Sequence, residues 1–169
     1  MKILSLAILC EENDCVMIGK HAAGPFAGTW GIASARADTD DRPTRAAARL
    51  AEYSSFGILG TRRSLEKQCE KRGRAADGTF IYSVYAPSTL TKQVDGVSSY
   101  ITSCFPLDES KRPVCPEGLV PWTEVIWLEL NKCGEKKLDP FSLESLRTLH
   151  GIIKQNRSSK KSECEDFNL

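Results

Sequence analysis

The chain has 169 residues, of which 41% are hydrophobic and 27% charged, and this composition is typical of one globular domain with a single core. Its formal net charge of +1 excludes a global field that would select nucleic acid, membranes or acidic partners. Any electrostatic preference must therefore be local.

The chain begins with two apolar strands. Residues 2–21 predict a hairpin that turns at Asn13–Asp14. The apolar run before Cys10 is short for a signal core, and Leu9 is too large for the residue before a cleavage site. No apolar run approaches the length that spans a membrane. We therefore expect a soluble protein that is not secreted and has no membrane partner.

Seven cysteines are spread along the chain without any C-x-x-C pair, and only two histidines accompany them. Zinc sites usually draw their ligands in closely spaced pairs, so this spacing does not favour a zinc site. Disulfides are rare in proteins that are not secreted. We expect reduced thiols and a cytoplasmic or nuclear location.

A central helix follows a glycine-rich loop. The loop surrounds a short strand at residues 30–33, and the helix is predicted from Pro43 to about Phe56. Asp40 or Asp41 is placed to cap its first turn, and Gly57 is a natural stop.

The second half of the chain predicts more strands and a last helix. A hairpin turns near Asp77–Gly78, residues 95–121 are rich in loops, and residues 123–131 form a strand. A helix with a leucine stripe begins after Asp139–Pro140. Residues 1–154 are predicted to form one domain of α/β class, and 155–169 a disordered polar tail.

The order of these elements resembles the Nudix hydrolase family from about residue 2 to residue 154. The resemblance implies an α/β/α sandwich with a mixed sheet, a central helix that carries the signature, and a C-terminal helix. The family signature is G-x5-E-x7-R-E-U-x-E-E-x-G-U, in which U is bulky and apolar. Its helix carboxylates lie on one face, hold magnesium or manganese, and so activate water against a pyrophosphate.

The segment RAAARLAEYSSFGI, residues 45–58, lacks those carboxylates in both registers that can be tried. Counting from Trp30 puts Asp41 at the first acid, and the three helix acids become Leu50, Tyr53 and Ser54. Counting back from Gly57 puts Arg42 at the first acid, and the three become Ala51, Ser54 and Ser55. Glu52 falls at a neighbouring position in each register.

We therefore predict no metal site, no cofactor and no catalytic residue, with Glu52 and Asp41 as residual candidates. Acids outside the helix leave a rebuilt magnesium or manganese site as an alternative: Asp38, Asp40, Asp41, Glu109, Glu117 and Glu124. A cysteine nucleophile would need a histidine base, whereas His21 is predicted in a turn and His150 on the last helix.

Basic and aromatic residues supply candidate ligand contacts. Residues 61–74 carry six basic side chains against two acids, on what is predicted to be a hairpin edge. Such charges either contact RNA phosphates or protect an exposed edge from aggregation. The basic candidates are Arg62, Arg63, Lys71, Arg72 and Arg74. The candidates to stack on a base are Trp30, Tyr82, Tyr85 and Trp122.

Three functions are consistent with the sequence. The favoured hypothesis is a catalytically degenerate Nudix-fold protein that binds a nucleotide or RNA without hydrolysing it. The second is a divergent hydrolase that acts on a nucleoside diphosphate linkage or an RNA cap. The third is a scaffold subunit with a protein partner in a larger assembly.

Overall fold

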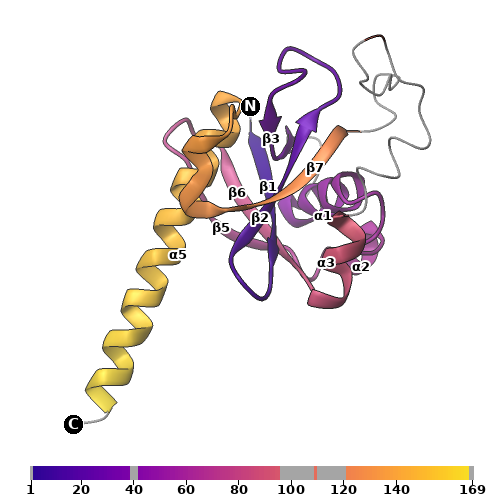
Figure 1. Ribbon diagram of the computed structural model, residues 1–169. Helices are drawn as coiled ribbons and strands as arrows, with labels where there is room; N and C mark the ends of the chain where they lie inside the picture. Colours follow the sequence, from indigo (N-terminus) through magenta and orange to yellow (C-terminus); the bar gives the residue numbers. More distant parts are fainter. Residues whose placement is uncertain (1, 39–41, 96–108, 110–120, 168–169) are drawn as a thin grey trace.

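The computed structural model describes residues 2–38, 42–95, 109 and 121–167. Its strands are β1 (Ile3–Cys10), β2 (Cys15–His21), β3 (Trp30–Gly31), β4 (Ala33–Arg36), β5 (Glu70–Arg74), β6 (Phe80–Ala86) and β7 (Trp122–Glu129). Its helices are α1 (Pro43–Ser54), α2 (Arg62–Leu65), α3 (Ser88–Asp95), the 3-10 helix η1 (Leu130–Glu135) and α5 (Pro140–Phe167), shown in Figure 1.

The strands form one mixed sheet of seven strands in the order β3-β2-β1-β6-β5, with β4 paired to β1 and β7 paired to β2. β1 and β6 run parallel, and the other pairs run antiparallel. The predicted hairpin of β1 and β2 is confirmed, with Leu9 opposite Val16. β1 therefore lies in the centre of the sheet, where both of its faces are covered.

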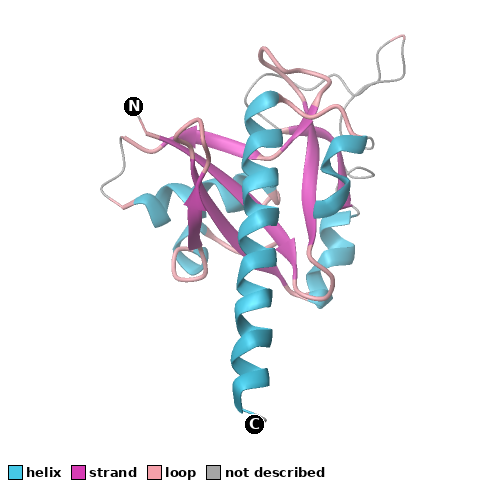
Figure 2. Ribbon diagram, turned by 90° about the vertical axis from the view of Figure 1, so that its left-hand side faces the viewer, coloured by secondary structure: helices cyan, strands magenta, loops and turns pink. Residues whose placement is uncertain are grey.

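Two hydrophobic cores lie on the two faces of the sheet. Along β1, Leu4 and Leu6 face the core that packs on α1, while Ala7 and Leu9 face the core that packs on α5. A strand buried on both faces reads as a continuous apolar run, which explains the segment from Ile3 to Cys10. Helices on both faces confirm the predicted α/β/α sandwich (Figure 2).

α1 packs closely on the sheet because alanines make up its buried face. Ala46, Ala47 and Ala51 have no exposed surface. The predicted aspartate cap is wrong: the N-cap is Arg42, which makes no side-chain cap hydrogen bond, and Pro43 follows it. At the first position of a helix the backbone N–H has no partner within the helix, so proline, which lacks that N–H, begins a helix at little cost.

The segment predicted as one long hairpin is divided in two. Only β5 and β6 form the hairpin, and the residues before it form α2, whose Ser64 N–H donates to Oγ1 of Thr61. Arg62 and Arg63 therefore lie on a helix, and their predicted place on the hairpin edge is wrong. A threonine that caps a helix competes locally with the extended conformation of a strand.

α5 is longer than the sequence pattern predicts. It continues as helix through Phe167, across most of the tail predicted to be disordered, and its end projects from the body of the molecule (Figure 1). Residues 152–167 contain no proline or glycine, so nothing interrupts the helix once its first turns have formed on the sheet. The predicted loop-rich stretch falls mainly on residues 96–120, which lie outside the described residues apart from Glu109.

None of the helices in the described part of the chain combines the length and apolar composition of a bilayer-spanning segment.

Candidate functional site

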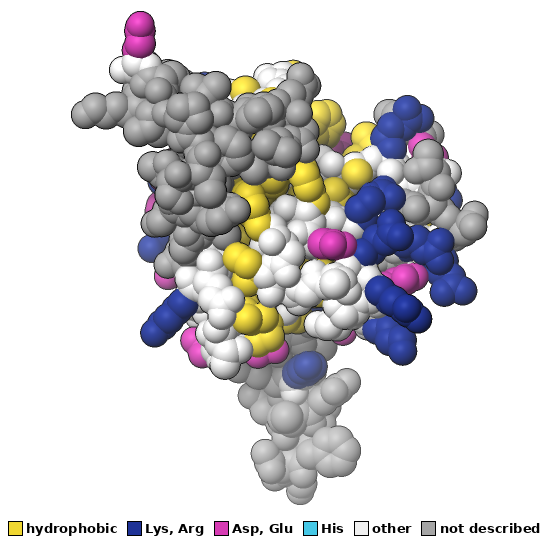
Figure 3. Space-filling model, turned by 90° about the vertical axis from the view of Figure 1, so that its right-hand side faces the viewer, with side chains coloured by type: hydrophobic (Ala, Val, Ile, Leu, Met, Phe, Trp, Pro, Cys, Tyr) yellow, Lys and Arg dark blue, Asp and Glu magenta, His cyan; other side chains and the backbone are white. Residues whose placement is uncertain are grey.

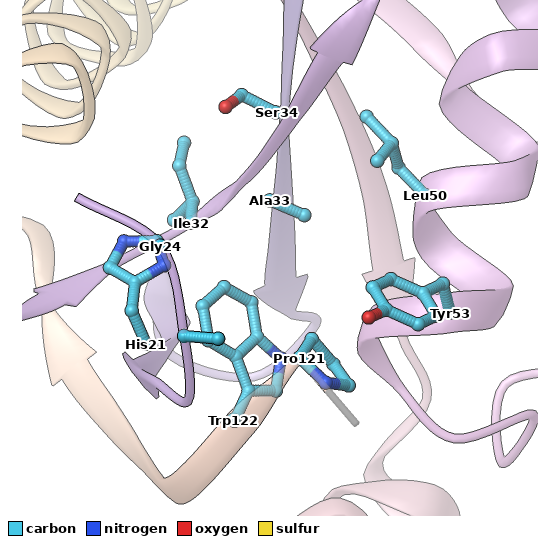
Figure 4. A pocket seen from close by; sticks show the side chains of 10 residues that line it. His21, Gly24, Ile32, Ala33, Ser34, Leu50, Tyr53, Pro121 and Trp122 are labelled. Atoms are coloured by element: carbon cyan, nitrogen blue, oxygen red, sulfur yellow. The ribbon is translucent and has the colours of Figure 1, made fainter. Parts of the chain in front are cut away.

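A pocket of about 320 Å³ opens between the C-terminal half of α1, the end of β2, the start of β4 and the start of β7 (Figure 4). Apolar side chains make up most of its wall, and His21, Ser34 and Tyr53 contribute polar atoms. The lining residues are His21, Ala23, Gly24, Ile32, Ala33, Ser34, Leu50, Tyr53, Pro121 and Trp122. Concave sites with an apolar wall and a few polar groups are typical of small-molecule binding.

α1 presents Leu50 and Tyr53 to this pocket. Ser54 and Ser55 do not reach it, because their hydroxyls donate to the backbone carbonyls of Leu50 and Ala51 one turn earlier. Leu50 and Tyr53 are two of the three acid positions in the register counted from Trp30. Burial raises the pKa of Tyr53, so its phenol keeps its proton at neutral pH.

The described acid candidates Glu52 and Glu124 are not among the residues that line the pocket. The Glu52 carboxylate accepts the backbone N–H of Arg62 at 2.7 Å, so it fixes the start of α2. Asp41 lies outside the described residues, and Glu124 is exposed on β7. Over the ranges that the structure describes, no three His, Cys, Asp or Glu side chains gather as a set of metal ligands.

Trp122 joins the sheet to the end of α1. Its indole Nε1 donates to the carbonyl of Ser54 at 3.1 Å, and only 2% of the residue is exposed. The ring lies against the bare backbone of Gly19, where an added Cβ would be 2.0 Å from Cδ2 of the indole. Trp122 is therefore part of the core as well as part of the pocket wall.

His21, Asp139 and Ser142 form a hydrogen-bonded group beside the pocket. His21 is the last residue of β2, so its predicted position in a turn is wrong. Its Nε2 lies 2.7 Å from Oδ2 of Asp139, and the backbone N–H of Ser142 donates to Oδ1 at 2.8 Å. Burial alone would raise the pKa of Asp139, but the hydrogen bonds from His21 and Ser142 outweigh it and lower that pKa.

The basic candidates fall on two different faces. Lys71 and Arg74 lie over the ring of Phe80, at 4.9 Å and 5.1 Å from its centroid, on the α1 side of the sheet. Arg72 instead donates to Oγ of Ser83 at 2.6 Å and lies 5.4 Å from the ring centroid of Tyr85. Successive side chains of β5 point to opposite faces of the sheet, so these basic residues do not form one surface although they are close in sequence.

The aromatic candidates are also dispersed. Tyr82 is buried in the core on the α1 side, and Tyr85 is exposed beside Arg72. Trp30 packs against the α5 core, with the Lys20 and Lys136 ammonium groups over its ring. Among the four, Trp122 is the one that lines the pocket.

The described thiols are Cys10, Cys15, Cys69 and Cys133, and all four are free. Burial, followed by the charge of Glu66, raises the pKa of Cys69 to about 11. A thiol with a raised pKa is a poor nucleophile at neutral pH.

By sequence, the chain matches no family model and no curated protein at a significant level. Solved structures with a similar fold include the Nudix domain of Shewanella oneidensis NrtR complexed with ADP ribose (12% identity, 92% of this chain and 87% of that chain covered, TM-score 0.52). A mutT/nudix family protein from Listeria innocua covers 92% of this chain and 94% of its own (12% identity, TM-score 0.53). The Nudix hydrolase RenU from M. smegmatis covers 91% and 86% (16% identity, TM-score 0.50). The chain therefore has the Nudix hydrolase fold, which confirms the predicted resemblance at the level of fold.

Proposed function

We propose that this protein binds a nucleotide in the pocket beside α1 and does not hydrolyse it. The observation that carries the proposal is the face of α1 that borders the pocket, where Leu50 and Tyr53 stand at two of the acid positions in the register counted from Trp30. Magnesium seeks anionic oxygen in octahedral geometry, which neither side chain supplies. An apolar wall instead favours the base and sugar of a nucleotide.

ADP-ribose is the natural first probe, because the Nudix domain of NrtR has been solved with it. The ligand carries a base, two sugars and a diphosphate, so it tests each kind of contact that the pocket offers. We expect it to bind equally with and without magnesium, since the wall does not depend on a bridging cation.

RNA is a second candidate ligand, supported by the basic residues on the α1 side of the sheet. Arg62 and Arg63 lie on α2, which packs beside α1, and the Lys71 and Arg74 side chains of β5 lie on the side of the sheet that α1 covers. Figure 3 shows Lys and Arg side chains gathered on one part of this side of the molecule. A basic surface on the same side of the sheet as α1 would bind the phosphates of a longer ligand.

Calorimetric titration of the pure protein with ADP-ribose tests the nucleotide proposal. Tyr53→Ala should weaken binding about tenfold, because it removes an aromatic wall worth about 1.4 kcal/mol. Tyr85→Ala is the matched control, since Tyr85 is comparably exposed (37% against 42%) and lies away from the pocket. Equal losses in the two variants, or no binding by the wild type, would count against the pocket.

The two other functions give different results in the same titration. A divergent hydrolase that uses Glu52 or Asp41 would bind ADP-ribose in a magnesium-dependent manner and release two monophosphates. A scaffold subunit would bind neither ADP-ribose nor RNA.

A further inference from the structure

His21 presents one ring nitrogen to the pocket and uses the other to bind Asp139. The side chain is 22% exposed, and its Nε2 is the atom that lies 2.7 Å from Oδ2 of Asp139. Figure 4 shows the imidazole at the pocket edge, with a ring nitrogen on the side of Trp122. The rings of Phe26 and Trp122 flank it at centroid distances of 6.5 and 5.3 Å.

Asp139 is held as a pure acceptor. The residue is 4% exposed, and its two oxygens accept from Ser142 N–H, from the Ser142 hydroxyl at 2.7 Å and from His21. The Ser142 hydroxyl points its proton at Asp139 because its own oxygen accepts the backbone N–H of Ile32 at 2.9 Å. An ionised carboxylate has no proton to give, so the proton between His21 and Asp139 belongs to Nε2.

A neutral imidazole carries one proton, so protonation at Nε2 leaves a bare lone pair at Nδ1. Across the residues described, no hydrogen bond to Nδ1 is formed. The pocket that His21 lines has a wall contributed largely by apolar groups such as Gly24, Ile32 and Ala33. A bare lone pair in such a wall attracts a donor and repels an anionic oxygen.

We propose that Nδ1 of His21 accepts a hydrogen bond from an N–H or O–H group of the nucleoside part of the ligand, so that the pocket selects base or sugar over phosphate. This inference rests on the proposed function. Asp139 acts on the ligand only through the tautomer of His21 and is a positioning residue.

The tautomer is measured in the protein without ligand, by nitrogen-15 NMR of the imidazoles at about pH 8, where an ordinary histidine is neutral. The chain has two histidines, so His150→Gln assigns the spectrum and serves as the control. We expect the proton of His21 on Nε2. Asp139→Asn should move it to Nδ1, because the amide of asparagine can donate to Nε2. A wild-type proton on Nδ1, or a tautomer unaffected by Asp139→Asn, would overturn the inference.

Ligand contact is measured on the same resonance with two probes, adenosine and inorganic pyrophosphate. Adenosine should shift the Nδ1 signal, and pyrophosphate at equal concentration should not. Asp139→Asn and His21→Phe should each weaken adenosine binding about five- to tenfold, the loss of about one hydrogen bond. Adenosine that binds without shifting Nδ1 would overturn this inference and leave the proposed function intact. If no nucleotide binds, the proposed function and the proposed ligand contact of Nδ1 are both wrong, and the tautomer measured without ligand is unaffected.

Discussion

Asp139 joins three elements: it directly precedes α5, its carboxylate accepts from His21 at the end of β2, and its backbone is hydrogen-bonded to β3. An added Cβ on Gly31 would lie 2.1 Å from its Oδ2. The backbone N–H of Asp139 donates to the carbonyl of Trp30 at 2.9 Å. The pocket edge therefore depends on a buried charge whose partners come from distant parts of the chain.

Asp139→Ala should lower the free energy of unfolding by about 3 kcal/mol at neutral pH, because it removes a buried hydrogen-bonded charge. The pKa of Asp139 is lowered by folding, so this stability is present above its unfolded pKa of 3.8 and is lost as pH falls through the folded value. Urea denaturation of wild type and variant between neutral and acidic pH measures the difference. Glu124→Ala, at an exposed position, is the control and should change the free energy of unfolding little. If the difference in unfolding free energy between wild type and Asp139→Ala does not shrink in acid, Asp139 is not the buried charge that stabilises the fold.

Gly19→Ala tests the contact between β2 and Trp122. A methyl group there would overlap the indole, so the ring must move and its bond to the Ser54 carbonyl must break. We expect a loss of about 2 kcal/mol or more in thermal unfolding. Gly151→Ala, where an added Cβ has open space within α5, should instead gain about 0.5–1 kcal/mol. Equal changes in stability in the two variants would mean that the Trp122 ring can move aside at little cost.

At the scale of elements, the sequence predicts the strands and helices that local patterns specify, and it misses the contacts between residues that are distant in the chain. Alternating and continuous apolar runs place β1, β2, β6 and β7 correctly, and Asp139–Pro140 marks the start of α5. α2 has four residues and is too short to leave a periodic signal. The contact of His21 with Asp139 joins residues 118 positions apart, so no local pattern reveals it.

α1 is a second example in which the sequence predicts the helix but not which of its side chains face the pocket. Its register against the signature is ambiguous in the sequence, whereas the structure turns Leu50 and Tyr53 to the pocket and Ser54 and Ser55 to their own helix. Which side chains of α1 face the pocket depends on how the helix packs on the sheet, so the sequence of the helix alone does not reveal it.

Magnesium should not raise the melting temperature of the wild type, because α1 offers the pocket no carboxylate from its described wall. The double variant Leu50→Glu/Tyr53→Glu places two acids on adjacent turns and should gain a magnesium-dependent stabilisation. Leu50→Gln/Tyr53→Gln is the neutral control of the same size. Thermal shift with and without millimolar magnesium is the measurement, and a clear response of the wild type would contradict the prediction.

Charge reversal on α2 and β5 tests RNA binding. Arg62→Glu/Arg63→Glu and Lys71→Glu/Arg74→Glu should each weaken binding of a short single-stranded RNA. A plot of the logarithm of the binding constant against the logarithm of the salt concentration should also become less steep. Its slope should change by about 0.7 for every phosphate that the variant no longer neutralises. Lys154→Glu/Lys160→Glu on exposed positions of α5 is the control. Unchanged slopes in the first two variants would mean that these residues do not bind RNA phosphates, and would leave edge protection as the role of Lys71 and Arg74 on β5.

At the scale of the whole molecule, the chain has the Nudix hydrolase fold, and the α1 side chains that border the pocket are Leu50 and Tyr53 rather than carboxylates. The α/β/α sandwich follows from strands that are apolar on both faces and from two helices with apolar stripes. α5 then extends beyond the body, an outcome that depends on helix continuity rather than on packing (Figure 1). A retained fold does not imply a retained reaction.

Phosphorus-31 NMR of ADP-ribose mixed with the pure protein and magnesium tests the central claim most directly, because one spectrum reports both binding and cleavage. Binding alone shifts or broadens the diphosphate signals, and hydrolysis by water replaces them with the signals of two monophosphates. We predict shifted diphosphate signals, weaker shifts with Tyr53→Ala, and no monophosphate. Monophosphate that accumulates in proportion to the protein, follows it through purification and disappears with Glu52→Gln would contradict the account.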